Sequence, residues 1–156
     1  MDMKPLQLLF LGLLFFTAGN LVAQNIYIYP EQSLEFGNFT VPNGGGTVPI
    51  TDSGDRYSTG TIQLLNSIYH PAIFQISTDN ITPLEVIVEV SREPLVNSEG
   101  TAMIMASVSP VADTYTIQAG EPAQVKIGGT IQMNTSDYTP GKFQGNISIT
   151  VIPNSE

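Results

Sequence analysis

Hydrophobic and polar residues alternate along most of the chain after residue 24, as in β-strands with one buried and one solvent-facing side. The longest alternating run covers residues 141–151, near the end of the sequence. A Pro140-Gly141 turn precedes it and Pro153 follows it, so we predict one closing strand that ends before Pro153. Its apolar residues share one parity: Phe143, Ile147, Ile149 and Val151.

Further apolar or alternating runs are separated by turn residues rich in Gly, Pro, Asn and Asp. The run at 59–65 also fits one helix face, but Gly60 and Pro71 confine it and favour a strand followed by a turn. Pro49 cannot donate to a ladder, which predicts an edge or a bulge for its strand. The other runs lie at 25–30, 33–39, 47–50, 72–77, 84–91, 102–108, 115–117, 125–127 and 131–133.

The spacing of these runs, without a long helix after residue 24, is typical of an all-β domain. We predict an antiparallel β-sandwich of about 8–10 strands, with a β-barrel as the alternative. A length of 156 residues is sufficient for one domain. Gly128-Gly129 is expected to separate two short strands.

Residues 1–23 differ from the rest of the chain. Lys4 precedes an apolar run at residues 8–16, and small residues lead to Ala23. This order predicts a secretory signal peptide cleaved after Ala23, which leaves a mature domain of residues 24–156. The apolar run is shorter than the roughly 20 residues of a membrane-spanning helix, so we expect no span in the mature protein. Bulky Leu21, three residues before the expected cleavage, leaves an uncleaved anchor as an alternative.

Cysteine content and charge narrow the classes of protein. The chain has no cysteine, so neither a disulfide framework nor a lipid-modified cysteine is expected. The predicted signal peptide indicates export to the periplasm, the cell surface or the medium. Without a cysteine the exported protein is not expected to be a lipoprotein. The net charge is −9, which excludes a groove that tracks nucleic-acid phosphates. The predicted mature chain has few basic residues: Arg56, Arg92, Lys126 and Lys142.

Several sequence blocks, taken in order, are similar to those of a known family. The order resembles a bacterial domain-of-unknown-function family of short secreted proteins, related to fimbrial (pilin) subunits and spore-coat-like pilins. The closing Pro-Gly-x-Phe-x-Gly motif is the most specific part of the likeness. The blocks are residues 34–39 with 44–50, residues 60–62 with 71–76, and residues 125–131 with 138–145.

This resemblance implies an immunoglobulin-like, pilin-like or adhesin-like sandwich with a structural or adhesive role. It provides no catalytic residues. The chain departs from many fimbrial subunits in having no disulfide. Such subunits also lack one strand, which a neighbour supplies. The segment containing Ile26 and Ile28 would then be either such an extension or the first strand of a complete domain.

Catalytic and metal chemistry have little support in the sequence. The single histidine, His70, has no recognisable nucleophile or orienting carboxylate in a motif around it, so we expect no enzyme and no cofactor. One His and no Cys cannot form a closed zinc site. Asp52 and Asp55 are weak calcium candidates, but Asp-Ser-Gly-Asp is also an ordinary turn sequence.

The residues therefore favour a non-enzymatic structural or adhesive protein that associates with itself or with other surface or fimbrial subunits through strand edges. The alternative is a carbohydrate-binding module that holds glycans on Tyr27 and Tyr29, which share one strand face. The absence of Trp counts against this alternative. Candidate partner-binding residues are Ile26, Ile28, Phe143, Ile147, Ile149 and Val151.

Overall fold

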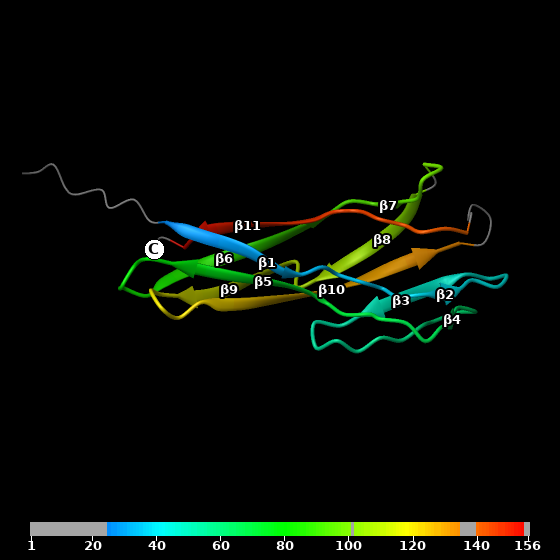
Figure 1. Ribbon diagram of the computed structural model, residues 1–156, viewed down its shortest axis with the longest axis horizontal. Helices are drawn as coiled ribbons and strands as arrows, with labels where there is room; N and C mark the ends of the chain where they lie inside the picture. Colours follow the sequence, from blue (N-terminus) through cyan, green and yellow to red (C-terminus); the bar gives the residue numbers. More distant parts are fainter. Residues whose placement is uncertain (1–24, 101, 135–139, 155–156) are drawn as a thin grey trace, which may run out of the picture.

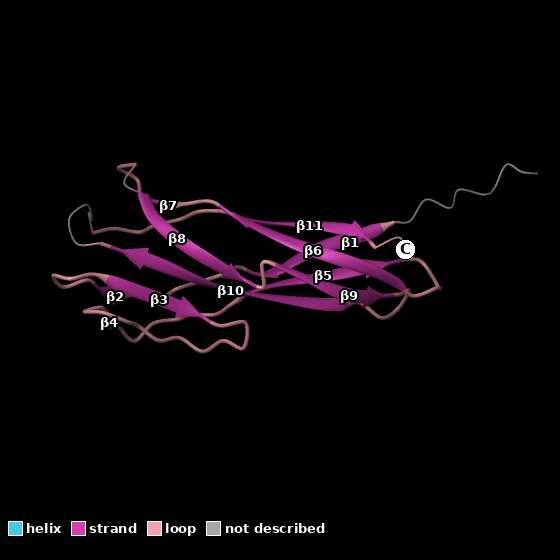
Figure 2. Cartoon of the chain, turned by 180° about the vertical axis from the view of Figure 1, so that it is seen from behind, coloured by secondary structure: helices cyan, strands magenta, loops and turns pink. Residues whose placement is uncertain are grey.

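The computed structural model describes residues 25–100, 102–134 and 140–154, which form strands and loops without a helix (Figures 1 and 2). The predicted signal peptide lies outside these residues. No helix in the described ranges is long and apolar enough to cross a membrane. The strands are β1 (Ile26–Gln32), β2 (Phe39–Thr40), β3 (Gly46–Ile50), β4 (Gln63–Leu64), β5 (Ala72–Thr78), β6 (Leu84–Arg92), β7 (Leu95–Val96), β8 (Ala102–Ser109), β9 (Ala112–Ile117), β10 (Ala123–Met133) and β11 (Ile147–Pro153).

The larger sheet is built around β10 and has the order β1-β5-β10-β8-β7, with β3 also paired to β10. The first half of β10 pairs with β5, and its second half pairs with β3 and β8. All of these pairs are antiparallel. Strand β1 pairs only with β5 and therefore lies at one edge of the sheet. Pro49 of β3 lies opposite Thr130 of β10. Among the described strands β3 pairs only with β10, so Pro49 lies in an edge strand, as predicted.

The smaller sheet has the order β11-β6-β9, and β2 pairs with β4 in a separate two-stranded ribbon. Strand β6 alternates buried and exposed residues, because its even-numbered apolar residues face the larger sheet and Glu85 and Glu89 face solvent. The buried residues of both sheets belong to one hydrophobic core. Each large side chain buried there contributes roughly 1.5–3 kcal/mol.

The structure confirms the all-β class, the antiparallel pairing and the absence of a helix among the described residues. Three of its eleven strands have two residues each, so the number of longer strands falls within the predicted range. An immunoglobulin-like order of strands stays a prediction.

The closing strand begins later and ends later than predicted. Regular pairing starts at Ile147, opposite Arg92, and continues through Pro153, opposite Val86. Upstream, Gln144 pairs with Val96, which is one residue out of register with the Ile147–Arg92 pair. The segment between Arg92 and Val96 therefore has one residue more than the segment opposite it. Pro94 lies in this longer segment and has no N–H to donate, so the ladder is interrupted there.

Residues 125–127 and 131–133 belong to one continuous strand, β10, and not to two short ones. Gly128 and Gly129 remain extended within it instead of forming a turn. They are needed for close approach: a side chain on Gly128 would collide with the backbone of Ile50, Thr51 and Asp52. Conversely, the predicted strand at 59–65 is reduced to Gln63–Leu64, because Gly60 adopts a positive φ of 68° in a turn.

Candidate functional site

The outer edge of β11 is a free pairing edge among the described strands. Strand β11 pairs with β6 alone, so no described strand is hydrogen-bonded to its other side. Its sequence from Ile147 to Ile152 has no charged residue, no glycine and no proline. Uncharged edges without proline or glycine accept further strands readily.

The hydrogen bonds on the inner side show which backbone groups point outward. Asn154 N donates to Glu85 O at 2.9 Å, and Asn146 O accepts from Glu93 N at 3.0 Å. Because bonded and non-bonded pairs alternate in an antiparallel ladder, the even-numbered residues of β11 bond to β6. The N–H and C=O groups that point away from β6 therefore belong to Ile147, Ile149 and Val151.

The predicted partner-binding residues of β11 have their side chains on the core side of the sheet. Ile147, Ile149 and Val151 are half-buried and pack against the core, as does Phe143 in the segment before the strand. The same three residues of β11 thus combine inward apolar side chains with outward backbone groups. A strand added at this edge would cover the exposed part of those side chains as well as satisfy their N–H and C=O groups.

Strand β1 is also an edge, but it is protected. It pairs within its own sheet, opposite β5 from Ile26 to Gln32, which favours a first strand over a free extension. Ile26 packs against the core, whereas Ile28 is 40% exposed. Pro30, a bulge after it and the charge of Glu31 all oppose further pairing at this edge. The edge strand β9 likewise includes a charged residue, Asp113.

The predicted sugar-binding tyrosines lie on the outer face of the larger sheet. Tyr27 and Tyr29 are 42% and 52% exposed, and their parity is opposite to that of core-facing Ile26. Tyr29 lies opposite Gln75 of β5, and Gln75 lies opposite Gln124 of β10. The side chain of Gln75 has no hydrogen-bond partner among the described residues. We call the row Tyr29, Gln75 and Gln124 the tyrosine row.

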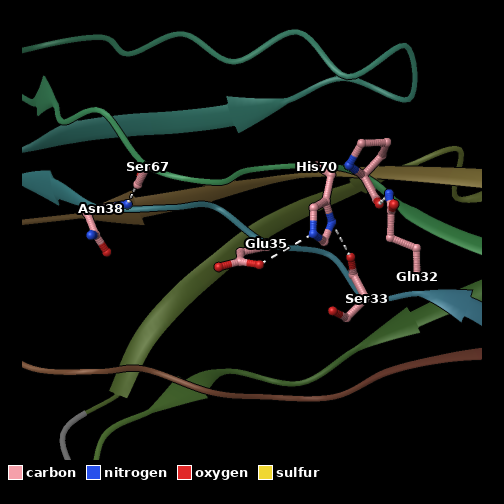
Figure 3. Close-up of polar contacts among 7 residues, drawn as sticks. Gln32, Ser33, Glu35, Asn38, Ser67 and His70 are labelled. Carbon is pink, nitrogen blue, oxygen red and sulfur yellow. Dashed lines mark hydrogen bonds and ion pairs between the residues drawn. The ribbon is translucent and has the colours of Figure 1, made fainter.

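His70 joins two backbone segments through its ring and its own backbone (Figure 3). Its Nδ1 lies 2.8 Å from Ser33 O, and its Nε2 lies 3.4 Å from a carboxylate oxygen of Glu35. Glu35 and His70 also exchange two backbone hydrogen bonds, of 2.9 and 3.0 Å. Nearby, Asn38 N donates to Ser67 Oγ at 2.7 Å. The cluster fastens the segment after β1 to the segment before β5.

Arg56 has a structural role that the sequence did not reveal. Its guanidinium donates to Asn38 O at 2.6 Å and to Leu65 O at 3.3 Å, and its carbon Cζ lies 5.2 Å from the ring centre of Tyr69. Burial lowers the pKa of Arg56 below its ordinary value, and the nearby Tyr69 opposes this shift. The arginine holds together the loops around the β2–β4 ribbon. No spacing in the sequence brings these three segments together.

Asp52 and Asp55 lie in a turn closed by its own polar groups. Ser53 N donates to Asp52 Oδ1 at 2.8 Å, and Ser53 Oγ donates to Asp55 Oδ2 at 3.3 Å. Among the described ranges there is no group of three or more His, Cys, Asp or Glu residues placed to hold a metal ion. The pKa of Tyr115 in β9 is raised above its ordinary value, first by burial and then by the negative charge of Asp113. Asp52 of this turn adds a smaller contribution in the same direction.

Comparison with known proteins gave one family and no curated relative. A family model described as a domain of unknown function (DUF4402) matches residues 26–152. No curated protein matches the chain. The expected likeness to a domain-of-unknown-function family is confirmed, whereas the expected relation to fimbrial subunits stays a prediction.

Proposed function

The chain belongs to the DUF4402 family, and we propose that it is an exported, non-enzymatic structural or adhesive protein that binds a partner through the β11 edge. In this proposal the domain is an immunoglobulin-like sandwich, related to fimbrial subunits and located in the periplasm, at the cell surface or outside the cell. The partner adds a strand beside Ile147, Ile149 and Val151.

The observation that carries the proposal is the contrast between the edges. Strands β1 and β9 include a charge, and β1 also has a proline and a bulge within its length, whereas β11 has none of these before Pro153. Proteins that remain monomeric usually protect such an edge. An edge left open along the whole of a well-packed strand is therefore a binding surface in this proposal.

Proline substitutions can test the edge directly. Val151→Pro removes an outward N–H and keeps every bond to β6, because residue 151 does not donate to that ladder. Thr150→Pro is the matched control, since it removes an N–H that bonds to Glu89 of β6. We expect Val151→Pro to abolish partner association, and Thr150→Pro to lower the free energy of unfolding by about 1–3 kcal/mol.

The measurement uses the full chain in the cells that produce it. Fractionation and mass spectrometry should recover a product that begins at Gln24 in high-molecular-weight material outside the cytoplasm. The Val151→Pro protein should be exported equally well but be found free of that material. If Val151→Pro assembles like the unchanged protein, the β11 edge is not the binding surface.

The tyrosine row supports a second candidate function, carbohydrate binding. A half-exposed ring beside the amides of Gln75 and Gln124 offers a stacking surface and hydrogen-bonding groups, which suit a neutral sugar. Gln124 Nε2 already donates to Glu31 Oε2 at 3.2 Å, so a sugar would share or replace that bond. We expect Tyr29→Ala to weaken any binding on a glycan array by roughly five- to tenfold. Tyr57→Ala is the control, because Tyr57 is equally exposed but lies beside β3. Equal signals from both variants would rule out the tyrosine row.

A further inference from the structure

We propose that the partner at the β11 edge is a second copy of the chain, whose β11 lies antiparallel with Ile149 of one copy opposite Ile149 of the other. This inference rests on the proposed function and adds the identity of the partner and the register. The two smaller sheets would then form one continuous sheet across a two-fold axis.

The positions of the outward backbone groups favour this register. A two-fold axis at Ile149 places Ile147 of one copy opposite Val151 of the other, so every outward N–H meets an outward C=O. Moving the axis by one residue, to Thr150, brings Ile147 opposite Pro153, which has no N–H to donate. Of these two registers, only the Ile149 register keeps a backbone N–H opposite each of the three outward residues.

Side chains and charge are also compatible with a second copy. In the Ile149 register the half-buried Ile147, Ile149 and Val151 meet their counterparts on the core side, where β-branched cross-strand pairs are favourable. The chain has a net charge of −9, which opposes approach of two copies over most of their surfaces. Strand β11 itself carries no charged residue from Ile147 to Ile152, so its own side chains add nothing to this repulsion.

Two double variants distinguish the registers. In the Ile149 register, Ser148 of one copy lies opposite Thr150 of the other, and both side chains are exposed on the outer face. Ser148→Glu with Thr150→Lys places opposite charges there, whereas Ser148→Lys with Thr150→Lys places like charges there. Both variants have the same Lys beside Glu89 of their own β6, so their folds are matched.

Sedimentation equilibrium of the mature chain, residues 24–156, gives the dimer dissociation constant. We expect the unchanged protein to dimerise and the Glu/Lys variant to dimerise at least as tightly. The Lys/Lys variant should bind itself roughly tenfold more weakly. Circular dichroism and thermal unfolding should show the same fold and stability in both variants.

A monomeric unchanged protein at its highest soluble concentration would overturn the inference. If Val151→Pro still prevented assembly at the cell surface in that case, the proposed function would stand with a different protein as the partner. Equal weakening of both double variants would overturn the register, because an axis at Thr150 places Lys opposite Lys in each of them. Unchanged affinity in both variants would overturn pairing through β11.

Discussion

Replacing Ile127 with Ala is expected to lower the free energy of unfolding by about 2–5 kcal/mol. Ile127 is fully buried in β10, opposite Ala72 of β5, at the point where β10 passes from β5 to its other partners. The substitution removes buried apolar area and leaves a cavity, because neighbouring strands on both sides prevent the core from closing around it.

Chemical denaturation followed by far-ultraviolet circular dichroism measures this effect. Ile81→Ala is the matched control, since the same change is made at an isoleucine that is 89% exposed and outside the strands. We expect the control to change the free energy of unfolding by less than about 0.5 kcal/mol. Equal losses at the two positions would contradict the position assigned to Ile127 in the core.

Replacing Gly128 with Ala is expected to destabilise the protein at the upper end of the roughly 1–3 kcal/mol usual for overpacking. A Cβ at this position would meet Ile50 O, and it would lie 2.8 Å from Thr51 C and 2.9 Å from Asp52 N. These are backbone atoms that cannot rotate away, so the chain after β3 must move. The cause is crowding, because Gly128 does not adopt a positive φ.

Thermal unfolding compares Gly128→Ala with Gly141→Ala. A Cβ on Gly141 would make ordinary contacts, the nearest being 3.6 Å from Asn97 Nδ2, and Gly141 also lacks a positive φ. We expect the melting temperature to fall clearly for the first variant and to stay nearly unchanged for the second. A stable Gly128→Ala protein would show that the chain after β3 does not cross β10 so closely.

The strands that alternate cleanly could be predicted from the sequence, because one face of each is buried. The even-numbered residues of β6 and the odd-numbered residues of β11 are examples. The pair Gly128-Gly129 predicts a break that β10 does not have, because a glycine needed for close approach and a glycine needed for a turn are identical in sequence. Pro94 shifts the register of a strand whose other residues follow the pattern.

The candidate site depends on topology, which the sequence did not specify. The sequence indicates both β1 and β11 as edge strands that could pair with a partner. Only the strand neighbours show that the free edge of β1 is protected against further pairing and that of β11 is not. The tyrosine row requires the β1–β5 and β5–β10 registers, because its three residues lie far apart in the chain. Arg56 was missed for the same reason, as it joins loops distant in sequence.

Hydrogen exchange at the amides of β11 tests most directly the claim that this edge is open and binds a second copy. In dilute solution the amides of Ile147, Ile149 and Val151 should exchange much faster than those of Ser148, Thr150 and Ile152, which bond to β6. At high concentration the odd-numbered amides should become protected. Fast exchange of the odd-numbered amides at every concentration, or their protection even in dilute solution, would contradict the account.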